Sequence, residues 1–188
     1  MKSDNSLGYG VYYSLDDYAG LFRRVAVIVI DSFFLLMLGL LLWILLFAVA
    51  GNANRGFDLS GLFFLSWLFF AWLYLTALKR SRIRTVAYRI LGLKIVTTRG
   101  EPPSLLTMTL RVSLWVFGPI NLLLDLLWMG ADTEQQSIRD CYLGTYVVRS
   151  DAEPIGEAPI HLTRYCGGGL ALMYPRVVRP QRPPSKRT

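Results

Sequence analysis

Charged side chains interrupt three apolar stretches of this sequence, and they are the residues most able to do chemistry there. Asp31 lies six residues inside the first stretch, whereas Arg111 and Asp125 lie in the third. A carboxylate within an apolar membrane segment is costly unless it is paired or neutralised, so it should face protein or water. Such an acid suits either a structural ion pair that fixes the register of two helices or a site that binds a cation or a proton.

The spacing of these charges predicts how they pair. Arg24 and Asp31 share one face of a helix, but their separation of seven residues is roughly 10 Å along its axis. Arg111 lies six residues beyond Leu105, at a comparable depth. We therefore expect Asp31 to face the protein interior with Arg111 as its nearest cation. Arg24 is expected at the level of the lipid headgroups, which its long side chain can reach.

A second candidate ion site lies in the third apolar stretch. Gly118-Pro119 interrupts the middle of this stretch, and a proline there kinks or breaks a helix. Asn121 and Asp125 are four residues apart and so share a helix face. Beside the half-helix ends they resemble the broken-helix ion sites of transporters. A short broken helix is also how an interfacial hairpin ends, so both interpretations stay open.

The acid Asp140 differs from the others because it follows a polar segment, which places it at the cytoplasmic surface. There its carboxylate can cap a turn or pair with Arg89 or Arg82. A structural role is therefore favoured for Asp140 over an ion site.

No pattern of residues indicates an enzyme or a metal site. His161 is the only histidine, which leaves Ser-His-Asp and Cys-His catalysis almost no basis. Cys141 and Cys166 form no CxxC motif or Cys/His cluster, so a zinc site is not expected. Gly167-Gly168-Gly169 lacks the preceding strand and following helix of a phosphate-binding loop and is interpreted as a flexible turn. We expect no catalytic activity, no metal and no cofactor.

The elements that must hold these charges are long and apolar. Of the 188 residues, 53% are hydrophobic and 18% are charged, against about 25% charged in a soluble domain. Residues 25–50 and 59–78 each reach the roughly 20 residues that cross a bilayer, and residues 105–130 form the third stretch. This composition excludes an ordinary soluble globule, a disordered chain and a disulfide scaffold.

The positive charge of the chain indicates topology rather than nucleic-acid binding. The chain has 20 Lys and Arg against 13 Asp and Glu, a formal net charge of +7. Residues 79–99 hold seven basic side chains and no acidic one, which is typical of a cytoplasmic loop beside anionic headgroups. We expect the N-terminus and this loop inside the cell and residues 52–58 outside. The expected partners are the lipid bilayer and its anionic headgroups, and no nucleic acid.

Two topologies remain open for residues 105–130. As one broken helix they cross the bilayer and put the C-terminus outside. As a re-entrant pair of half-helices they leave the C-terminus inside. The basic, Pro-rich residues 176–188 favour the second topology, because Lys and Arg accumulate on the cytoplasmic side.

The predicted fold class is an all-α membrane protein with two transmembrane helices, a broken or re-entrant third hydrophobic segment and a small cytoplasmic β element. Residues 1–13 are interpreted as a loose polar tail, and residues 150–188 as a basic tail containing Pro and Gly. Between them, residues 14–149 form the membrane domain, with Ser14 as the N-cap of a helix that continues into the first span.

Residues 84–98 are amphipathic and suit an interfacial element that turns β-like at its end. Residues 93–98 and 145–149 are both rich in β-branched side chains. We expect these two segments to pair as strands, which requires an even number of membrane crossings between them.

Four motifs follow one another in an order that is specific to a known family. Arg24 precedes Asp31 by seven positions, and residues 85–96 read TVAYRILGLKIV. Arg111 lies in the next apolar segment, and residues 138–148 read IRDCYLGTYVV. Over residues 19–149 the sequence resembles the RDD family of bacterial membrane proteins, which is named for one Arg and two Asp.

Two positions depart from the family pattern. Ala87 replaces the first Gly of the Thr-x-Gly-x-x-x-x-Gly-x-Lys/Arg box, and Arg139 replaces the residue, often His, before Asp140 in the closing motif. The resemblance implies a multi-pass inner-membrane protein whose activity is mostly undefined, with sodium/proton exchange associated with a few members.

We expect a structural, accessory or regulatory role in the cell membrane, without catalysis. The alternative is a cation/proton (Na+/H+) antiporter, or a subunit of one, that uses buried Asp31. The candidate ion or ion-pair residues are Arg24, Asp31, Arg111, Asp125 and Asp140. A chain with so few spans would need a homo-oligomer or a membrane protein complex to enclose a pathway.

Overall fold

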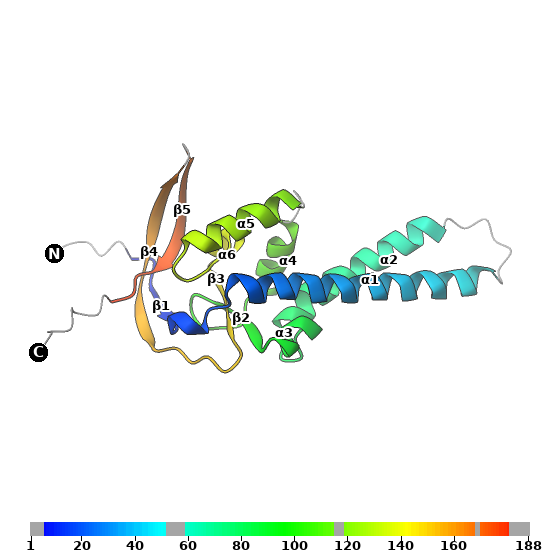
Figure 1. Ribbon diagram of the computed structural model, residues 1–188, viewed down its shortest axis with the longest axis horizontal. Coiled ribbons are helices and arrows are strands. Elements are labelled where there is room, and N and C mark those ends of the chain that lie inside the picture. The colour runs from blue at the N-terminus through cyan, green and yellow to red at the C-terminus, as the bar shows by residue number, and fades with distance from the viewer. Residues whose placement is uncertain (1–5, 52–58, 115–118, 168–169, 181–188) are drawn as a thin grey trace, which may run out of the picture.

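The computed structural model describes residues 6–51, 59–114, 119–167 and 170–180, and the structural statements below concern these residues. They form a mostly helical body with two small antiparallel sheets (Figure 1). In chain order the elements are β1 Tyr9–Tyr12, η1 Leu15–Asp17, α1 Leu21–Gly51, α2 Leu59–Leu73, η2 Tyr74–Leu78, α3 Val86–Ile90, β2 Leu93–Thr97, α4 Leu105–Ser113, α5 Pro119–Ala131, α6 Ile138–Leu143, β3 Thr145–Arg149, β4 Gly156–Gly167 and β5 Leu170–Val177.

Two helices are long and apolar enough to cross a membrane. The candidate spans are Leu21–Val49, within α1, and Leu59–Leu78, which comprises α2 and the π-helix η2. Only 6% of the most apolar window of the first span and 11% of that of the second is buried. The core helix of a soluble protein would be mostly buried, whereas a lipid-facing helix keeps its apolar side chains exposed. Figure 1 shows the two helices projecting together beyond the rest of the fold.

The two long helices pack through one glycine and several aromatic rings. The indole of Trp67 lies against Gly39 and donates a 3.3 Å hydrogen bond to the backbone carbonyl of Leu35. Trp43 meets Phe63 edge-on, with ring centroids 5.1 Å apart. Aromatic side chains of α2 such as Trp67 and Phe63 therefore pack against α1, in addition to the contact with lipid that the sequence predicts.

The third apolar stretch forms two short helices, as its proline predicts. α4 has 9 residues and α5 has 13, and each is too short to cross a bilayer alone. The Ser104 side chain caps α4 by accepting a 3.0 Å hydrogen bond from the Thr107 amide. The Asn121 amide of α5 donates to the carbonyl of Leu114, which ties the two helices together. Gly118 lies outside the described residues.

Strands β2 and β3 pair antiparallel, which confirms the pairing expected between residues 93–98 and 145–149. Leu93 lies opposite Arg149 and Thr97 opposite Thr145. Before β2, the amphipathic segment forms only the five-residue helix α3, in which Ala87 and Tyr88 are buried. The turn between α3 and β2 contains Gly92, whose φ of 60° is a conformation that glycine adopts without strain.

The described residues near both ends of the chain form strands and not loose tails, which corrects the sequence interpretation of residues 1–13 and 150–188 where the structure describes them. β1 pairs with β4, and β4 pairs with β5, in a three-stranded antiparallel sheet. Alternate residues Ala158 and Ile160 of β4 are buried, whereas their neighbours Glu157, Pro159 and His161 are not, which is the period of a half-buried strand. The fold is therefore mostly helical with five described strands, and not all-α. The reason is that the N-terminal and C-terminal segments, which the sequence predicts to be irregular, pair with each other in one sheet.

The start of α1 also differs from the expectation. Ser14 precedes only the 3₁₀-helix η1 and makes no side-chain cap. Tyr18 then adopts an extended conformation and bridges to Val148, and the Ala19 amide donates a 2.8 Å hydrogen bond to Val147. Because this segment is held on β3, the helix cannot run continuously from Ser14, and α1 begins at Leu21.

Strand β3 lies between two hydrophobic cores. Tyr146 and Val148 pack in the core shared with the three-stranded sheet. Val147 packs in the other core, with Val27 of α1 and Met108 of α4. Successive side chains of a strand point to opposite faces, so one five-residue strand joins the sheets to the base of the helices.

Candidate functional site

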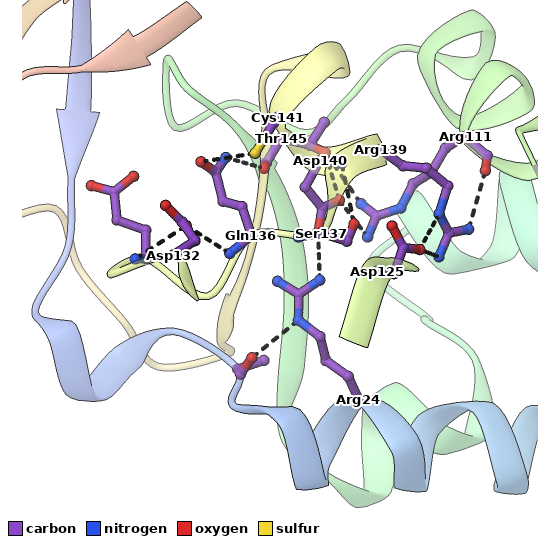
Figure 2. A network of polar contacts seen from close by, with 12 residues as sticks. Arg24, Arg111, Asp125, Asp132, Gln136, Ser137, Arg139, Asp140, Cys141 and Thr145 are labelled. Carbon is purple, nitrogen blue, oxygen red and sulfur yellow. Dashed lines mark hydrogen bonds and ion pairs between the residues drawn. The ribbon is translucent and has the colours of Figure 1, made fainter. Parts of the chain in front are cut away.

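Buried charged side chains collect where α1, α4 and α6 meet (Figure 2). Asp31, Asp125 and Asp140 are all buried, at 4%, 4% and 0% exposure. Each has a cationic partner, as the cost of burying a charge requires. The partners come from distant parts of the sequence and differ from those that spacing predicted.

Asp140 is the centre of the cluster and not a surface residue, which corrects the sequence interpretation. Its carboxylate pairs with Arg24 through one oxygen and with Arg111, at 2.6 Å, through the other. It also accepts a 3.1 Å hydrogen bond from the Thr145 hydroxyl. Ser137 and Asp140 form a reciprocal capping box at the start of α6. The predicted capping role is therefore present, but Arg82 and Arg89 are not the partners.

The electrostatics of Asp140 follow from this setting. Complete burial by itself raises the pKa of its carboxyl group, because water no longer stabilises the charge. The guanidinium groups of Arg111 and Arg24 more than offset this effect and hold the pKa below its usual range. Asp140 is therefore ionised at neutral pH and suits a permanent ion pair better than proton exchange.

Asp31 faces the protein interior, as expected, but its cation is Lys79 and not Arg111. Lys79 lies 2.9 Å from one carboxylate oxygen, and the Tyr74 hydroxyl donates a 2.9 Å hydrogen bond to the other. The Thr85 hydroxyl lies 3.5 Å from the same carboxylate oxygen that Lys79 contacts. Arg111 is unavailable to Asp31 because it is engaged by Asp140 and by the hydroxyl of Thr145.

The π-helix η2 explains how both Tyr74 and Lys79 reach Asp31. In an α-helix, residues five apart point about 140° away from each other. A π-helix bonds each residue to the fifth residue along, so such residues lie nearly above one another. Residues Tyr74–Leu78 adopt this geometry, and Lys79 follows directly. The widened turn therefore directs a hydroxyl and an ammonium group to the same carboxylate.

Asp125 pairs with Arg139, whose Nη2 and Nε lie 2.6 and 2.7 Å from its Oδ2 atom. Asn121 bonds to the end of α4 instead, so the two residues do not form the joint ion site considered from the sequence. Arg139 stands where the family pattern often has His, and Asp125 supplies its counter-charge. Burial lowers the pKa of Arg139, and the Asp125 carboxylate opposes that effect.

A cavity of about 320 Å³ lies among these ion pairs. Arg24, Asp31, Lys79, Arg111 and Arg139 supply its charged wall. The remaining wall is largely apolar and comes from α1, η2, α4 and β3, with Val27, Ile28, Leu35, Leu75, Met108, Val112 and Val147. Three of the five candidate residues, Arg24, Asp31 and Arg111, therefore line this cavity. The other two, Asp140 and Asp125, contribute by pairing with lining arginines.

A second polar cluster ties the C-terminal sheet to the helices. Arg176 of β5 lies 3.1 Å from Asp132, and Arg179 donates a 2.9 Å hydrogen bond to Glu134. Burial raises the pKa of the Glu134 carboxyl group, whereas Arg176 and Arg179 oppose the rise. This cluster anchors residues that the sequence analysis had interpreted as a tail.

Nothing in the described residues provides a metal site, since no group of three His, Cys, Asp or Glu side chains is placed to hold an ion. Cys141 is a buried free thiol. The side chain of Cys166 lies outside the described residues.

Sequence reasoning missed four residues of the site: Tyr74, Lys79, Ser137 and Arg139. Ser137-x-x-Asp140 is a recognisable capping-box pattern and could have placed Asp140 in a helix turn. Lys79 is the first cation after the second span, which is a weaker signal. The π-helix that brings Tyr74 to Asp31 has no evident signature in the sequence.

The apolar helices and the buried ion pairs at their base indicate a helical membrane protein. The chain belongs to the RDD family, whose model matches residues 18–144. No curated protein and no solved structure matches it. The family resemblance inferred from the motifs is therefore confirmed, and Arg24 and Asp140 of those motifs are in contact, whereas Asp31 pairs separately with Lys79.

Proposed function

We propose that this chain is a multi-pass protein of the cell membrane with a structural, accessory or regulatory role and no catalytic activity. The observation that carries the proposal is that each buried aspartate at the base of the helices has a cationic partner: Asp140 has two arginines, Asp125 has Arg139, and Asp31 has Lys79. Such ion pairs hold helices in one arrangement, because removing either partner leaves an uncompensated buried charge.

The strand pairings support a topology with both chain ends in the cytoplasm. β1 pairs with β4, and the Val11 amide of β1 donates a 2.8 Å hydrogen bond to the carbonyl of Thr98, beside β2. Segments before α1, between the spans and the third stretch, and after α5 therefore lie together, at one end of the molecule in Figure 1. Two crossings, by α1 and by α2 with η2, satisfy this arrangement if α4 and α5 re-enter or lie at the interface. The basic loop 79–99 favours the cytoplasm for this side, because Lys and Arg accumulate there.

The Asp31–Lys79 pair marks the inner edge of the hydrocarbon core in this arrangement. Leu59–Leu78 contains 20 residues, which extend about 30 Å and match a bilayer core. Lys79 follows directly, and it pairs with Asp31. Arg24 is then about 10 Å farther toward the cytoplasm, at the depth of the headgroups. This placement favours anionic headgroups as partners, together with a second copy of the chain or a larger membrane complex. It does not favour nucleic acid.

A specific observation also favours the second candidate, a cation/proton antiporter or a subunit of one. Asp31 is the only acidic residue in the described cavity wall, and Lys79 is its counter-charge. A carboxylate beside a cavity can exchange a lysine partner for a proton or a sodium ion. In that case Asp31 would carry the exchanged ion, and oligomerisation would enclose its pathway.

Flux measurements on the purified chain in proteoliposomes distinguish these functions. The accessory role predicts no proton or sodium movement under an imposed sodium or pH gradient. Sodium-dependent proton movement that is lost in Asp31→Asn would establish the antiporter instead. Asp151→Asn is the matched control, because it makes the same chemical change at an exposed ion pair. Flux that survives both substitutions would contradict a role for Asp31 and point to another pathway.

A further inference from the structure

The cavity beside Asp31 has an excess of positive charge. Four of its charged lining residues are cations, namely Arg24, Lys79, Arg111 and Arg139, and one is an acid. Asp125 and Asp140 lie behind the wall and pair with three of these cations. These residues are four cations and three carboxylates, so the cluster that they form has a net charge of +1.

The cluster also has hydrogen-bond donors to spare. A guanidinium group has five N–H donors and no acceptor. Arg24 uses Nε to bond the Ala19 carbonyl at 3.0 Å and Nη1 to bond Asp140. Its Nη2 is buried and has no hydrogen-bond partner among the described residues. A buried, charged donor of this kind is costly unless an anion or a polar ligand satisfies it.

The rest of the cavity suits an amphiphile. Its wall is largely apolar. On the two candidate spans, Leu35 and Leu75 lie about one helical turn farther into the membrane than Asp31 and Lys79. In the arrangement described above, the Asp31–Lys79 pair lies at the edge of the hydrocarbon core and Arg24 at headgroup depth. The cations therefore lie where phosphate groups of the inner leaflet are found, and the apolar wall lies where acyl chains begin.

From this geometry we propose that the cavity binds the phosphoryl group of an anionic phospholipid, held by Arg24, Arg111, Arg139 and Lys79. Arginine suits such an oxyanion because its fork of donors matches the phosphate oxygens. The bound lipid would complete the charge balance of the cluster and stabilise the junction of α1, α4 and α6. This site goes beyond the accessory role proposed above, and it differs from general attraction of the basic loop to the membrane surface.

The test compares the thermal unfolding midpoint of the full chain in nanodiscs of phosphatidylcholine alone and with phosphatidylglycerol added. Substituting the arginines would disrupt the fold, so the cavity is blocked instead by Val112→Trp, on its α4 wall. Leu110→Trp is the matched control, since Leu110 is 46% exposed on the same helix and does not line the cavity. A third arm replaces phosphatidylglycerol with millimolar inorganic phosphate.

Phosphatidylglycerol should raise the midpoint of the wild-type chain and of Leu110→Trp by about 5 °C, because a ligand that binds only the folded state stabilises it. Val112→Trp should lose most of this rise. An equal rise in Val112→Trp would overturn the cavity site, since the basic loop would then account for it. An equal rise with inorganic phosphate alone would overturn the assignment to a lipid. No rise in the wild-type chain would overturn the proposal altogether.

Discussion

Arg24, in the first turn of α1, forms a buried ion pair with Asp140, which lies 116 residues later in α6. Arg111 of α4 binds the other oxygen of the same carboxylate at 2.6 Å. Asp140, in the six-residue helix α6, thus connects the candidate span α1 to α4, the first half of the third apolar stretch. Through the hydroxyl of Thr145 it also contacts β3, the strand that lies between the two cores.

Substituting Asp140 should be the most damaging single change in this cluster. Asp140→Asn leaves two guanidinium groups without their counter-charge, whereas Arg24→Gln leaves the Arg111 pair intact. Losing one partner of a buried pair costs about 3–5 kcal/mol, so Asp140→Asn should reduce stability by at least that much. The midpoint of unfolding in detergent measures the effect. Asp151→Asn, at the exposed Arg149 pair, should leave the midpoint unchanged. A larger loss for Arg24→Gln than for Asp140→Asn would contradict the central place of Asp140.

The pH dependence of this contribution follows from the direction of the pKa shift. The folded-state pKa of Asp140 is lowered. Its stabilising effect is therefore fully present above the unfolded-state pKa of about 3.9 and is lost as the pH falls through the folded value. The difference in unfolding midpoint between the wild-type chain and Asp140→Asn should stay constant from about pH 8 to pH 5 and narrow only below about pH 4. A difference that already changes near neutral pH would mean that another group titrates.

The coupling of Asp31 is expected with Lys79 and not with Arg111. Asp31→Asn and Lys79→Gln should each destabilise the chain, and the double variant should recover part of the loss, because it leaves no unpaired charge. Asp31→Asn combined with Arg111→Gln is the control cycle and should be additive. Unfolding midpoints of the single and double variants provide both coupling energies. A non-additive Asp31–Arg111 cycle would favour the pairing first inferred from spacing.

The contact between α1 and α2 should be sensitive to a single methyl group. A Cβ atom on Gly39 would lie 2.8 Å from Nε1 of Trp67. Gly39→Ala should therefore cost about 1–3 kcal/mol of unfolding free energy through overpacking. Gly130→Ala, in α5, is the matched control, because nothing lies within 4 Å of the added atom. It should be neutral or stabilising, since alanine is the better helix former. Equal effects at both positions would show that helix propensity, and not the tryptophan contact, decides the result.

Cys141 should be unreactive in the folded protein. Burial raises the pKa of its thiol to about 12, and the thiolate is the reactive form. In a Cys166→Ser background, a maleimide at neutral pH should label Cys141 only after unfolding, as mass spectrometry can show. Rapid labelling of the native chain would indicate that α6 opens readily and that the Asp140 cluster is weaker than the contacts imply.

The amino-acid sequence by itself determined the features that depend on local composition. Two apolar stretches of about 20 residues or more predict long membrane helices, and Pro119 predicts the break between α4 and α5. β-Branched residues at 93–98 and 145–149 predict the pairing of β2 with β3. The ordered motifs identify the RDD family, and the apolar setting of Asp31 predicts its burial.

Only the tertiary structure decided which charges meet. Spacing along one helix predicts depth, but the choice between Arg111 and Lys79 for Asp31 depends on competition from Asp140, which comes from another element. The π-helix that brings Tyr74 and Lys79 to Asp31 was likewise visible only in the folded structure. Segments β1 and β4 form strands because they satisfy each other's backbone groups, although they lie far apart in the sequence. Local periodicity carries no information on such long-range partners, so ion pairing and the three-stranded sheet emerge only when the chain is folded.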